Sequence, residues 1–192
     1  MKETILAIDP GTTKSAYLLY QEGSILGFDK LDNCQILLVA EGCNANLMAI
    51  EMPACYGMAV GKSVFETCRW VGIFQQAFGL SKTYLVYRKS CSDEGVDSIL
   101  MHLCHNTRAK DTNVRRAIID LYGGDEKAIG GVRCRKCNGK GWFGAGRPVC
   151  PVCNGDKWKS PPGPLKGIVD DAWAALAVAI TFDETFIRCR NT

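Results

Sequence analysis

The sequence predicts an α/β fold in which helices flank a mixed sheet, with a small insertion before the last helix. Short apolar runs at 5–8 and 47–50 each end in an acidic residue, as buried strands do when they deliver a side chain to one end of a sheet. Apolar residues recur at three- and four-residue spacing across 62–78, which indicates an amphipathic helix. Between 130 and 164 the chain becomes rich in Gly, Cys, Lys and Arg, which marks the insertion.

The first strand is expected to end at Asp9. Pro10 and Gly11 then form a turn, and 15–20 continues as a second strand, so the segment predicts a β-hairpin, with a third antiparallel strand at 23–30. A carboxylate at the end of a core strand costs free energy unless it is paired or binds a cation. An Asp can also serve as a local turn residue, so this stretch alone leaves both roles open for Asp9.

The middle of the chain repeats this design at Glu51, where an apolar run ends in an acid followed by Pro53. Two such strands suggest a shared site. Asn33 is expected to cap a helix over 32–38, and Ser63 with Glu66 is expected to form a capping box. The remaining expected elements are a helix at 62–78, a strand at 83–87, a loop at 90–96, and helices at 98–104 and 114–122.

The last helix is expected over 168–180 and is apolar nearly all round, which indicates a buried helix. Its first turn carries Asp170 and Asp171. The helix macrodipole favours acids at that end, so these two residues have a purely structural explanation beside a functional one.

Two Cys-x-x-Cys motifs lie twelve residues apart within the insertion, formed by Cys134, Cys137, Cys150 and Cys153. This spacing is typical of one structural Zn²⁺ held by four thiolates, with a redox pair as the alternative. Asn-Gly follows each motif and permits a tight turn. Because the insertion has few aliphatic residues, its folding is expected to depend on the metal.

The insertion is strongly basic. Residues 127–166 contain nine Lys or Arg and one acid, interleaved with Trp142, Phe143 and Trp158. This combination predicts binding to DNA or RNA. The alternative is a solvated basic surface that serves solubility.

Composition limits the protein class. The chain has 192 residues, is 47% hydrophobic, and contains no apolar run long enough to cross a bilayer. The first residues enter a strand directly, so no signal peptide and no membrane association are expected. The chain has eleven cysteines, and the single ones at 34, 43, 55, 68 and 104 are expected to be small buried thiols. We therefore expect a cytoplasmic protein.

Carboxylates from three separate elements, Asp9, Glu51 and the pair Asp170 and Asp171, are the hard oxygen ligands that Mg²⁺ prefers. Two such ions would activate a water and stabilise the leaving oxygen of a phosphodiester.

In this order the motifs resemble the ribonuclease H-like superfamily, and within it the RuvC-like Holliday junction resolvases, especially phage-encoded relatives. The resemblance rests on Ala-Ile-Asp-Pro-Gly-Thr at 7–12, Ile-Glu-Met-Pro at 50–53 with 56–58, and the helix at 171–179. Lys110 and Asp111, with Arg115 and Arg116, are also similar. The resemblance implies a nuclease core over 1–129 and 165–192, with a zinc-binding insertion at 130–164.

One position departs from the family, whose last helix usually carries two aspartates three residues apart. With Asp171 as the first, Ala174 takes the place of the second. Asp170 or a water could fill that place, although neighbouring helical positions point about 100° apart. Of the two aspartates, Asp171 is favoured.

The resemblance implies a hydrolase of DNA recombination and repair. It would be an endodeoxyribonuclease dependent on two Mg²⁺ (or Mn²⁺) ions that cuts four-way junctions as a homodimer, with 62–78 as the dimer helix. A phage-encoded enzyme would act in the host cytoplasm. The expected DNA contacts are Lys14, Lys62, Arg69, Arg88, Lys89, Arg108, Lys110, Arg115 and Arg116 in the core, and Lys136, Lys140 and Arg147 in the insertion.

Three alternatives remain open at this stage. A catalytically inactive protein could bind nucleic acid through the zinc module, as the Ala174 departure would suggest. The Asp-x-Gly-Thr-Thr pattern at 9–13 also resembles the first phosphate loop of actin-like ATPases, although no second loop or adenosine site is recognisable. His102 and His105 could form a second metal site or be ordinary surface histidines.

Overall fold

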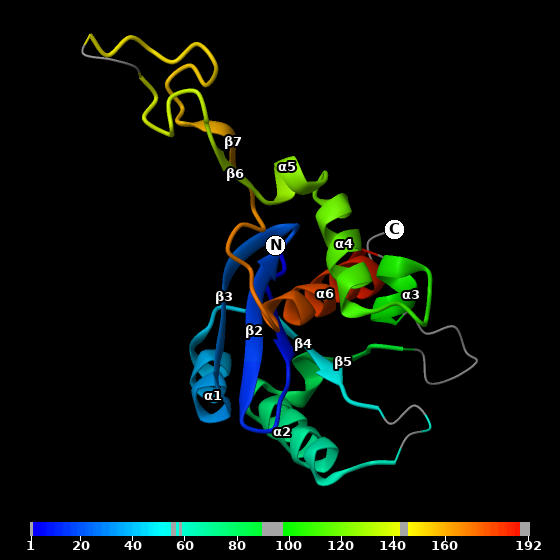
Figure 1. Cartoon of the computed structure of the whole chain (residues 1–192). Coiled ribbons are helices and arrows are strands. Elements are labelled where there is room, and N and C mark those ends of the chain that lie inside the picture. Colours follow the sequence, from blue (N-terminus) through cyan, green and yellow to red (C-terminus); the bar gives the residue numbers. More distant parts are fainter. Residues whose placement is uncertain (1, 55–56, 58, 90–97, 143–145, 189–192) are drawn as a thin grey trace. The chain divides into compact units, whose positions relative to one another are not determined.

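The computed structural model describes residues 2–54, 57, 59–89, 98–142 and 146–188. The chain divides into two compact units, one of residues 1–115 with 168–192 and one of residues 116–167 (Figure 1). The expected insertion, 130–164, lies inside the second unit, and the expected loop at 90–96 lies outside the described residues.

The first unit is built on a five-stranded mixed sheet, which confirms the predicted α/β class. The strand order is β3-β2-β1-β4-β5. β1 pairs antiparallel with β2, and β2 with β3, whereas β1–β4 and β4–β5 are parallel. The strands are β1 (Ile5–Asp9), β2 (Lys14–Gln21), β3 (Ser24–Asp32), β4 (Leu47–Met52) and β5 (Thr83–Tyr87).

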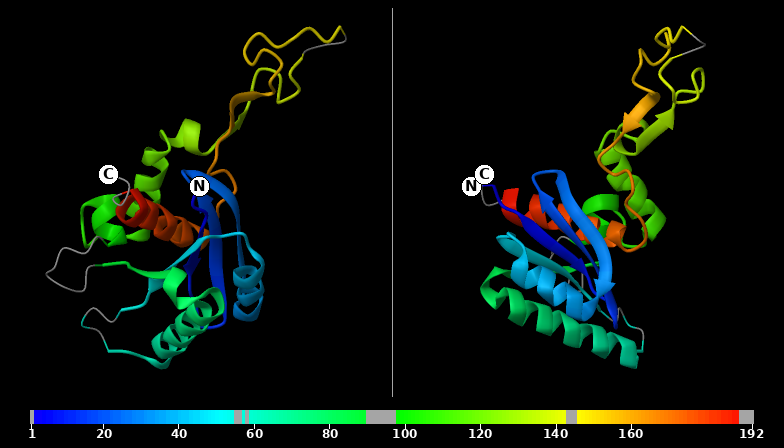
Figure 2. Two further views of the ribbon diagram at one scale, coloured as in Figure 1. Left: turned by 180° about the vertical axis from the view of Figure 1, so that it is seen from behind. Right: turned by 90° about the vertical axis from the view of Figure 1, so that its left-hand side faces the viewer.

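Helices cover both faces of this sheet (Figure 2). Alternate strand residues, including Leu6 and Ile50, pack with Ile36 of α1 (Asn33–Gly42) and Phe74 of α2 (Lys62–Phe78). α6 (Ala172–Phe182) contacts β1, β2 and β4, and every one of its residues except Ala174 is buried. The prediction of a buried last helix is therefore confirmed.

The shorter elements complete the first unit. Ser98 caps α3 (Ile99–Cys104): its hydroxyl oxygen accepts a hydrogen bond from the Met101 amide. The others are the 3₁₀ turn η1 (Leu80–Lys82), the π-helical turn η2 (Asp183–Ile187) after α6, and the first part of α4 (Asp111–Leu121).

The second unit holds the rest of α4, α5 (Asp125–Ala128) and the antiparallel pair β6 (Gly130–Arg133) and β7 (Trp158–Pro162). Within the described ranges of the chain, no helix combines the length and apolar character needed to cross a membrane.

Two predicted helix caps are wrong. α1 is capped by Asp32, whose amide donates to Gln35 Oε1 at 3.2 Å, whereas Asn33 is the first helical residue. α2 begins after Gly61 without a side-chain cap, so the Ser63–Glu66 capping box does not form. Of the thiols expected to be buried, Cys34 on α1 is exposed, Cys43, Cys68 and Cys104 are only partly buried, and Cys55 lies outside the described residues.

Asn33 is buried because it closes the turn after β1. Its amide group donates to the Gly11 carbonyl at 3.0 Å, and its Oδ1 accepts from Ser15 Oγ at 2.7 Å. Ser15 Oγ in turn accepts from the Gly11 amide at 3.1 Å. This closed ring satisfies the Gly11 amide and carbonyl together with the Ser15 and Asn33 groups that bind them, and it fixes the backbone directly after Asp9.

Candidate active site

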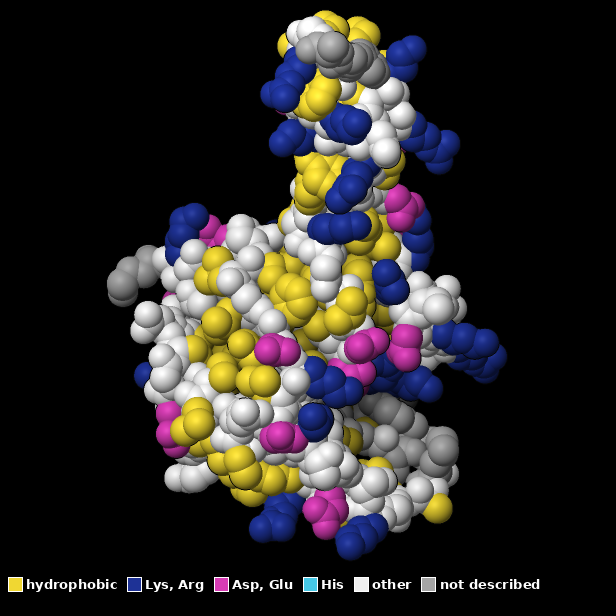
Figure 3. Space-filling view, turned by 60° about the vertical axis from the view of Figure 1, so that its left-hand side comes forward, with side chains coloured by type: hydrophobic (Ala, Val, Ile, Leu, Met, Phe, Trp, Pro, Cys, Tyr) yellow, Lys and Arg dark blue, Asp and Glu magenta, His cyan; other side chains and the backbone are white. Residues whose placement is uncertain are grey.

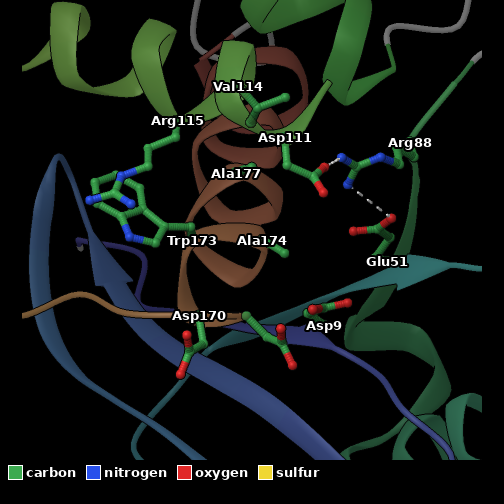
Figure 4. Close-up of a pocket in the computed structure, with 11 residues that line it drawn as sticks. Asp9, Glu51, Arg88, Asp111, Val114, Arg115, Asp170, Trp173, Ala174 and Ala177 are labelled. Atoms are coloured by element: carbon green, nitrogen blue, oxygen red, sulfur yellow. Dashed lines mark hydrogen bonds and ion pairs between the residues drawn. The ribbon is translucent and has the colours of Figure 1, made fainter. Parts of the chain in front are cut away.

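Acidic side chains from four elements line one pocket of the first unit, a cavity of about 210 Å³ (Figure 4). Asp9 comes from β1, Glu51 from β4, Asp111 from α4, and two aspartates precede α6. The full lining is Asp9, Glu51, Arg88, Asp111, Val114, Arg115, Asp170, Asp171, Trp173, Ala174 and Ala177.

The sheet register brings Asp9 and Glu51 together. β1 and β4 run parallel with Ile8 opposite Ile50, so the next residue of each strand reaches the same end of the sheet. Because side chains alternate, Asp9 and Glu51 both point to the face that α6 covers, opposite the face of Ile8 and Ile50. The sequence prediction that these two strands deliver acids to a shared place is consistent with this arrangement.

Glu51 is held in a poorly solvated position. Its side chain is 14% exposed, its Oε1 lies 3.8 Å from Arg88 Nη1, and its Oε2 is buried without a hydrogen-bond partner. Burial raises the pKa of Glu51, although the charge of Arg88 and a hydrogen bond from it oppose this. Arg88 also pairs with Asp111, so one guanidinium bridges two acids.

The buried Asp9 carboxyl group is disfavoured in its charged form. Burial raises its pKa, and the charges of Glu51 and Asp171 raise it further, to about 7, against the opposing charges of Arg88 and Lys30. Without a bound cation, this carboxyl group is therefore protonated in a large fraction of molecules at neutral pH.

Asp170 and Asp171 precede α6 and do not lie within its first turn, which corrects the sequence prediction. Asp171 is the N-cap residue, and Asp170 has the left-handed φ of 46°. Adjacent residues of a regular helix point about 100° apart, but the left-handed turn lets both aspartates line the same pocket. The α6 residues that line the pocket are Trp173, Ala174 and Ala177, so this helix adds no carboxylate to the described lining.

The donor set fits a divalent cation. Carboxylate oxygens are the ligands of Mg²⁺ and Mn²⁺, and the unpartnered Glu51 Oε2 and the raised pKa of Asp9 both indicate a missing positive charge. Among the described residues, only the four cysteines of the second unit form a group whose ligand atoms all lie within 4.8 Å of one another. The carboxylates would therefore have to draw closer around an ion.

The predicted DNA-binding residues of the core fall into three groups. Arg88 and Arg115 line the pocket, and the Arg115 guanidinium lies 4.6 Å from the centre of the Trp173 ring. Lys14 pairs with Asp32 at 3.7 Å, and Arg116 pairs with Asp120 and Asp125 at 2.6 Å each. The others, Lys62, Arg69, Lys89, Arg108 and Lys110, do not line the pocket.

Sequence reasoning gave no site role to two charged residues, although one of them, Asp111, is among the residues that carry the family resemblance. Asp111 lines the pocket and binds Arg88. Lys30 Nζ lies 2.5 Å from Asp171 Oδ2. The two-residue alternation of the hairpin could have placed Lys30 on the face of Asp9, but only with the strand register known.

The second unit contains the four-cysteine cluster. Sγ of Cys134 lies 3.8 Å from that of Cys150, and Sγ of Cys137 lies 3.6 Å from that of Cys153. A tetrahedral Zn²⁺ with Zn–S bonds near 2.3 Å would place its sulfurs about 3.8 Å apart, so the cluster fits this ion. The Gly141 amide donates to Cys137 Sγ at 3.2 Å, as thiolate ligands favour.

The turns after the two motifs are tight, as predicted. Asn138 and Asn154 adopt left-handed φ values of 50° and 47°. Lys140 and Arg147 lie 5.7 and 5.0 Å from the centre of the Trp142 ring, and Arg133 lies 6.0 Å from that of Trp158. Lys136 lines a second cavity with Arg135 and Lys159. Figure 3 shows Lys and Arg side chains gathered on this unit. Phe143, the third aromatic residue named with the basic ones, lies outside the described residues.

The two histidines do not meet at a common site. The His102 Nε2 lies 2.7 Å from Glu184 Oε2, and His105 is the exposed C-cap of α3. Within the residues that the structure describes, neither belongs to a cluster able to hold a metal.

Comparison with known proteins identifies the fold. No protein-family profile and no curated protein sequence matches the chain. The Thermus thermophilus RuvC structure matches with a TM-score of 0.56 and 13% identity, covering 97% of this chain and 96% of that one. T. thermophilus RuvC in complex with Holliday junction substrate matches with a TM-score of 0.53 and 13% identity, covering 98% and 96%. The chain therefore has the RuvC-like, ribonuclease H-like fold, which confirms the predicted fold class and the resemblance at the level of structure.

Replacement of two cysteines of the cluster tests zinc binding and the independence of the second unit. The double variant Cys134→Ser, Cys137→Ser is expected to lose one bound Zn²⁺ per chain by elemental analysis and to show collapsed amide dispersion for 130–164. The core should keep its cooperative unfolding transition, because none of its helices or strands depends on these thiols. Cys68→Ser serves as the control, since it removes a thiol of α2 outside the cluster. Unfolding of the whole chain in the double variant would contradict this division.

The raised pKa of Asp9 predicts a pH dependence of the metal-free protein. Between about pH 4 and pH 7 the folded state holds a proton that the unfolded state releases, so the free energy of unfolding falls as pH rises, by up to about 4 kcal/mol. Asp9→Asn should remove most of this fall in denaturant titrations with EDTA, and saturating Mg²⁺ should reverse it in wild type. Glu41→Gln, an exposed acid of α1, should leave the profile unchanged. Equal pH profiles for wild type and Asp9→Asn would refute the raised pKa of Asp9.

Proposed function

We propose that this protein is a Mg²⁺- or Mn²⁺-dependent endodeoxyribonuclease that cuts branched DNA, with the four-way junction as its preferred substrate. The observation that carries the proposal is the convergence of Asp9, Glu51 and Asp171 on one pocket, with an unpartnered buried oxygen and too little positive charge. The RuvC fold supports it, since one matched neighbour was solved with Holliday junction substrate.

In the proposed reaction the acidic and the basic residues of the pocket have different roles. Asp9, Glu51 and Asp171 would hold the divalent ions, with Asp170 as a further oxygen donor. Two such ions, when bound, would supply an activated water and stabilise charge on the leaving oxygen. In such a hydrolysis the water oxygen would bond to phosphorus as the phosphorus–oxygen bond of the leaving group breaks, and the proton lost by the water would balance the one gained by the leaving oxygen. Arg88 and Arg115 lie where they can orient the phosphodiester.

DNA binding is assigned to the basic residues. Arg115 stacked on Trp173 presents a fixed guanidinium at the pocket rim, suited to a phosphate. The zinc-binding insertion at 130–164 would bind the DNA through Lys136, Lys140 and Arg147. A homodimer with two pockets would cut two symmetric strands, and Phe65 of α2, 66% exposed, is an apolar residue available for such an interface.

A second candidate is a nucleic-acid-binding protein without activity. It is favoured by the absence of a carboxylate at Ala174, where the pocket wall of α6 is apolar. The actin-like ATPase alternative has less support, because the Gly11 amide, which a phosphate loop would direct at a nucleotide, donates to Ser15.

Cleavage of a labelled mobile four-way junction tests the proposal, beside linear duplex and a three-way fork. In Mg²⁺, wild type is expected to introduce paired nicks in the junction, and Asp9→Asn is expected to lose cleavage while it keeps binding. Ca²⁺ in place of Mg²⁺ should permit binding without cleavage. Glu41→Gln is the matched control, an exposed acid outside the pocket that should cut like wild type. Tight junction binding without cutting by wild type would instead establish the inactive binding protein.

A further inference from the structure

Lys30 lies on the same row of the sheet as Asp9. Asp9 pairs with Ala16 across β1 and β2, and Ala16 pairs with Lys30 across β2 and β3. Directly opposed residues of neighbouring strands project to the same face, and the middle residue has only a methyl side chain. The Lys30 side chain therefore extends over Ala16 to the carboxylates, where its ammonium reaches Asp171 at 2.5 Å.

The Lys30–Asp171 pair is open to solvent, unlike the acids deeper in the pocket. Their side chains are 45% and 47% exposed, against 14% for Glu51. A pair this exposed contributes little to stability, so a competing partner can separate it readily.

Two basic residues from different elements each pair with one acid of the pocket. Arg88 of the segment after β5 pairs with Glu51, and Lys30 of β3 pairs with Asp171. Asp9 lies between, and feels the charges of both cations. A divalent ion carries twice the charge of an ammonium and approaches carboxylate oxygens to about 2.1 Å, so it would compete with Lys30 for Asp171.

We propose that Lys30 is a catalytic residue with two partners: it neutralises Asp171 in the metal-free protein, and it binds a non-bridging oxygen of the reacting phosphodiester once a divalent ion occupies that carboxylate. This inference rests on the proposed nuclease function. The released ammonium stays within a side-chain length of the pocket, on its solvent side, where a DNA backbone must approach. There it stabilises the negative charge that develops on the phosphate in the transition state.

Lys30→Met tests this exchange, because the two roles predict opposite effects. Calorimetry without DNA should show Mg²⁺ binding severalfold tighter than in wild type, since no ammonium competes for Asp171. Junction cleavage at saturating Mg²⁺ should fall about 10²-fold, the usual loss on removing one transition-state donor. Lys30→Arg should retain more cleavage than Lys30→Met. Lys2→Met is the matched control, because Lys2 forms a similar exposed pair with Glu22 at 2.7 Å and lines no part of the pocket.

The outcomes separate this inference from the nuclease function. If wild type binds Mg²⁺ and cuts junctions while Lys30→Met matches it in either metal affinity or cleavage rate, the role of Lys30 is refuted and the nuclease function stands. If wild type neither binds Mg²⁺ nor cuts, both fall together. Circular dichroism of each variant checks that lost cleavage does not reflect lost folding.

Discussion

The cost of burying carboxylates beside one another is the constraint on which the site depends. Asp9 and Glu51 end adjacent parallel strands on one face of the sheet, and Asp171 enters from the start of α6. Folding therefore brings negative charges together where few water molecules can solvate them. Burial and the charges of its neighbours both raise the pKa of Asp9. The proposed divalent cation would relieve the cost of holding these charges side by side, and the metal-free protein would be less stable for lack of it.

The fold supplies the rigidity that such an arrangement requires. The hydrogen-bonded ring of Gly11, Ser15 and Asn33 fixes the turn after Asp9, and the parallel register fixes Glu51 beside it. The buried helix α6 places Asp171, and the left-handed residue Asp170 turns the chain just before it. Arg88 and Lys30 then offset part of the charge from two sides.

The sequence was informative where local pattern decides structure. Apolar runs that end in acids predicted β1 and β4 and their shared site, and the Cys-x-x-Cys spacing predicted the four-sulfur cluster. The cap of α1 could not be predicted, because Asp32 and Asn33 are both good caps and a tertiary bond to Ser15 engages Asn33. Lys30 was missed because its position depends on strand register, and β2–β3 contains a bulge between Leu19 and Tyr20.

A crystal structure determined in Mn²⁺, with anomalous scattering to locate the ion, is the direct test of whether the pocket carboxylates hold a divalent metal. We expect anomalous density in contact with Asp9 and Glu51, with Asp171 turned from Lys30 toward the ion. Crystals in saturating Mn²⁺ that show no anomalous density in this pocket would contradict the proposal.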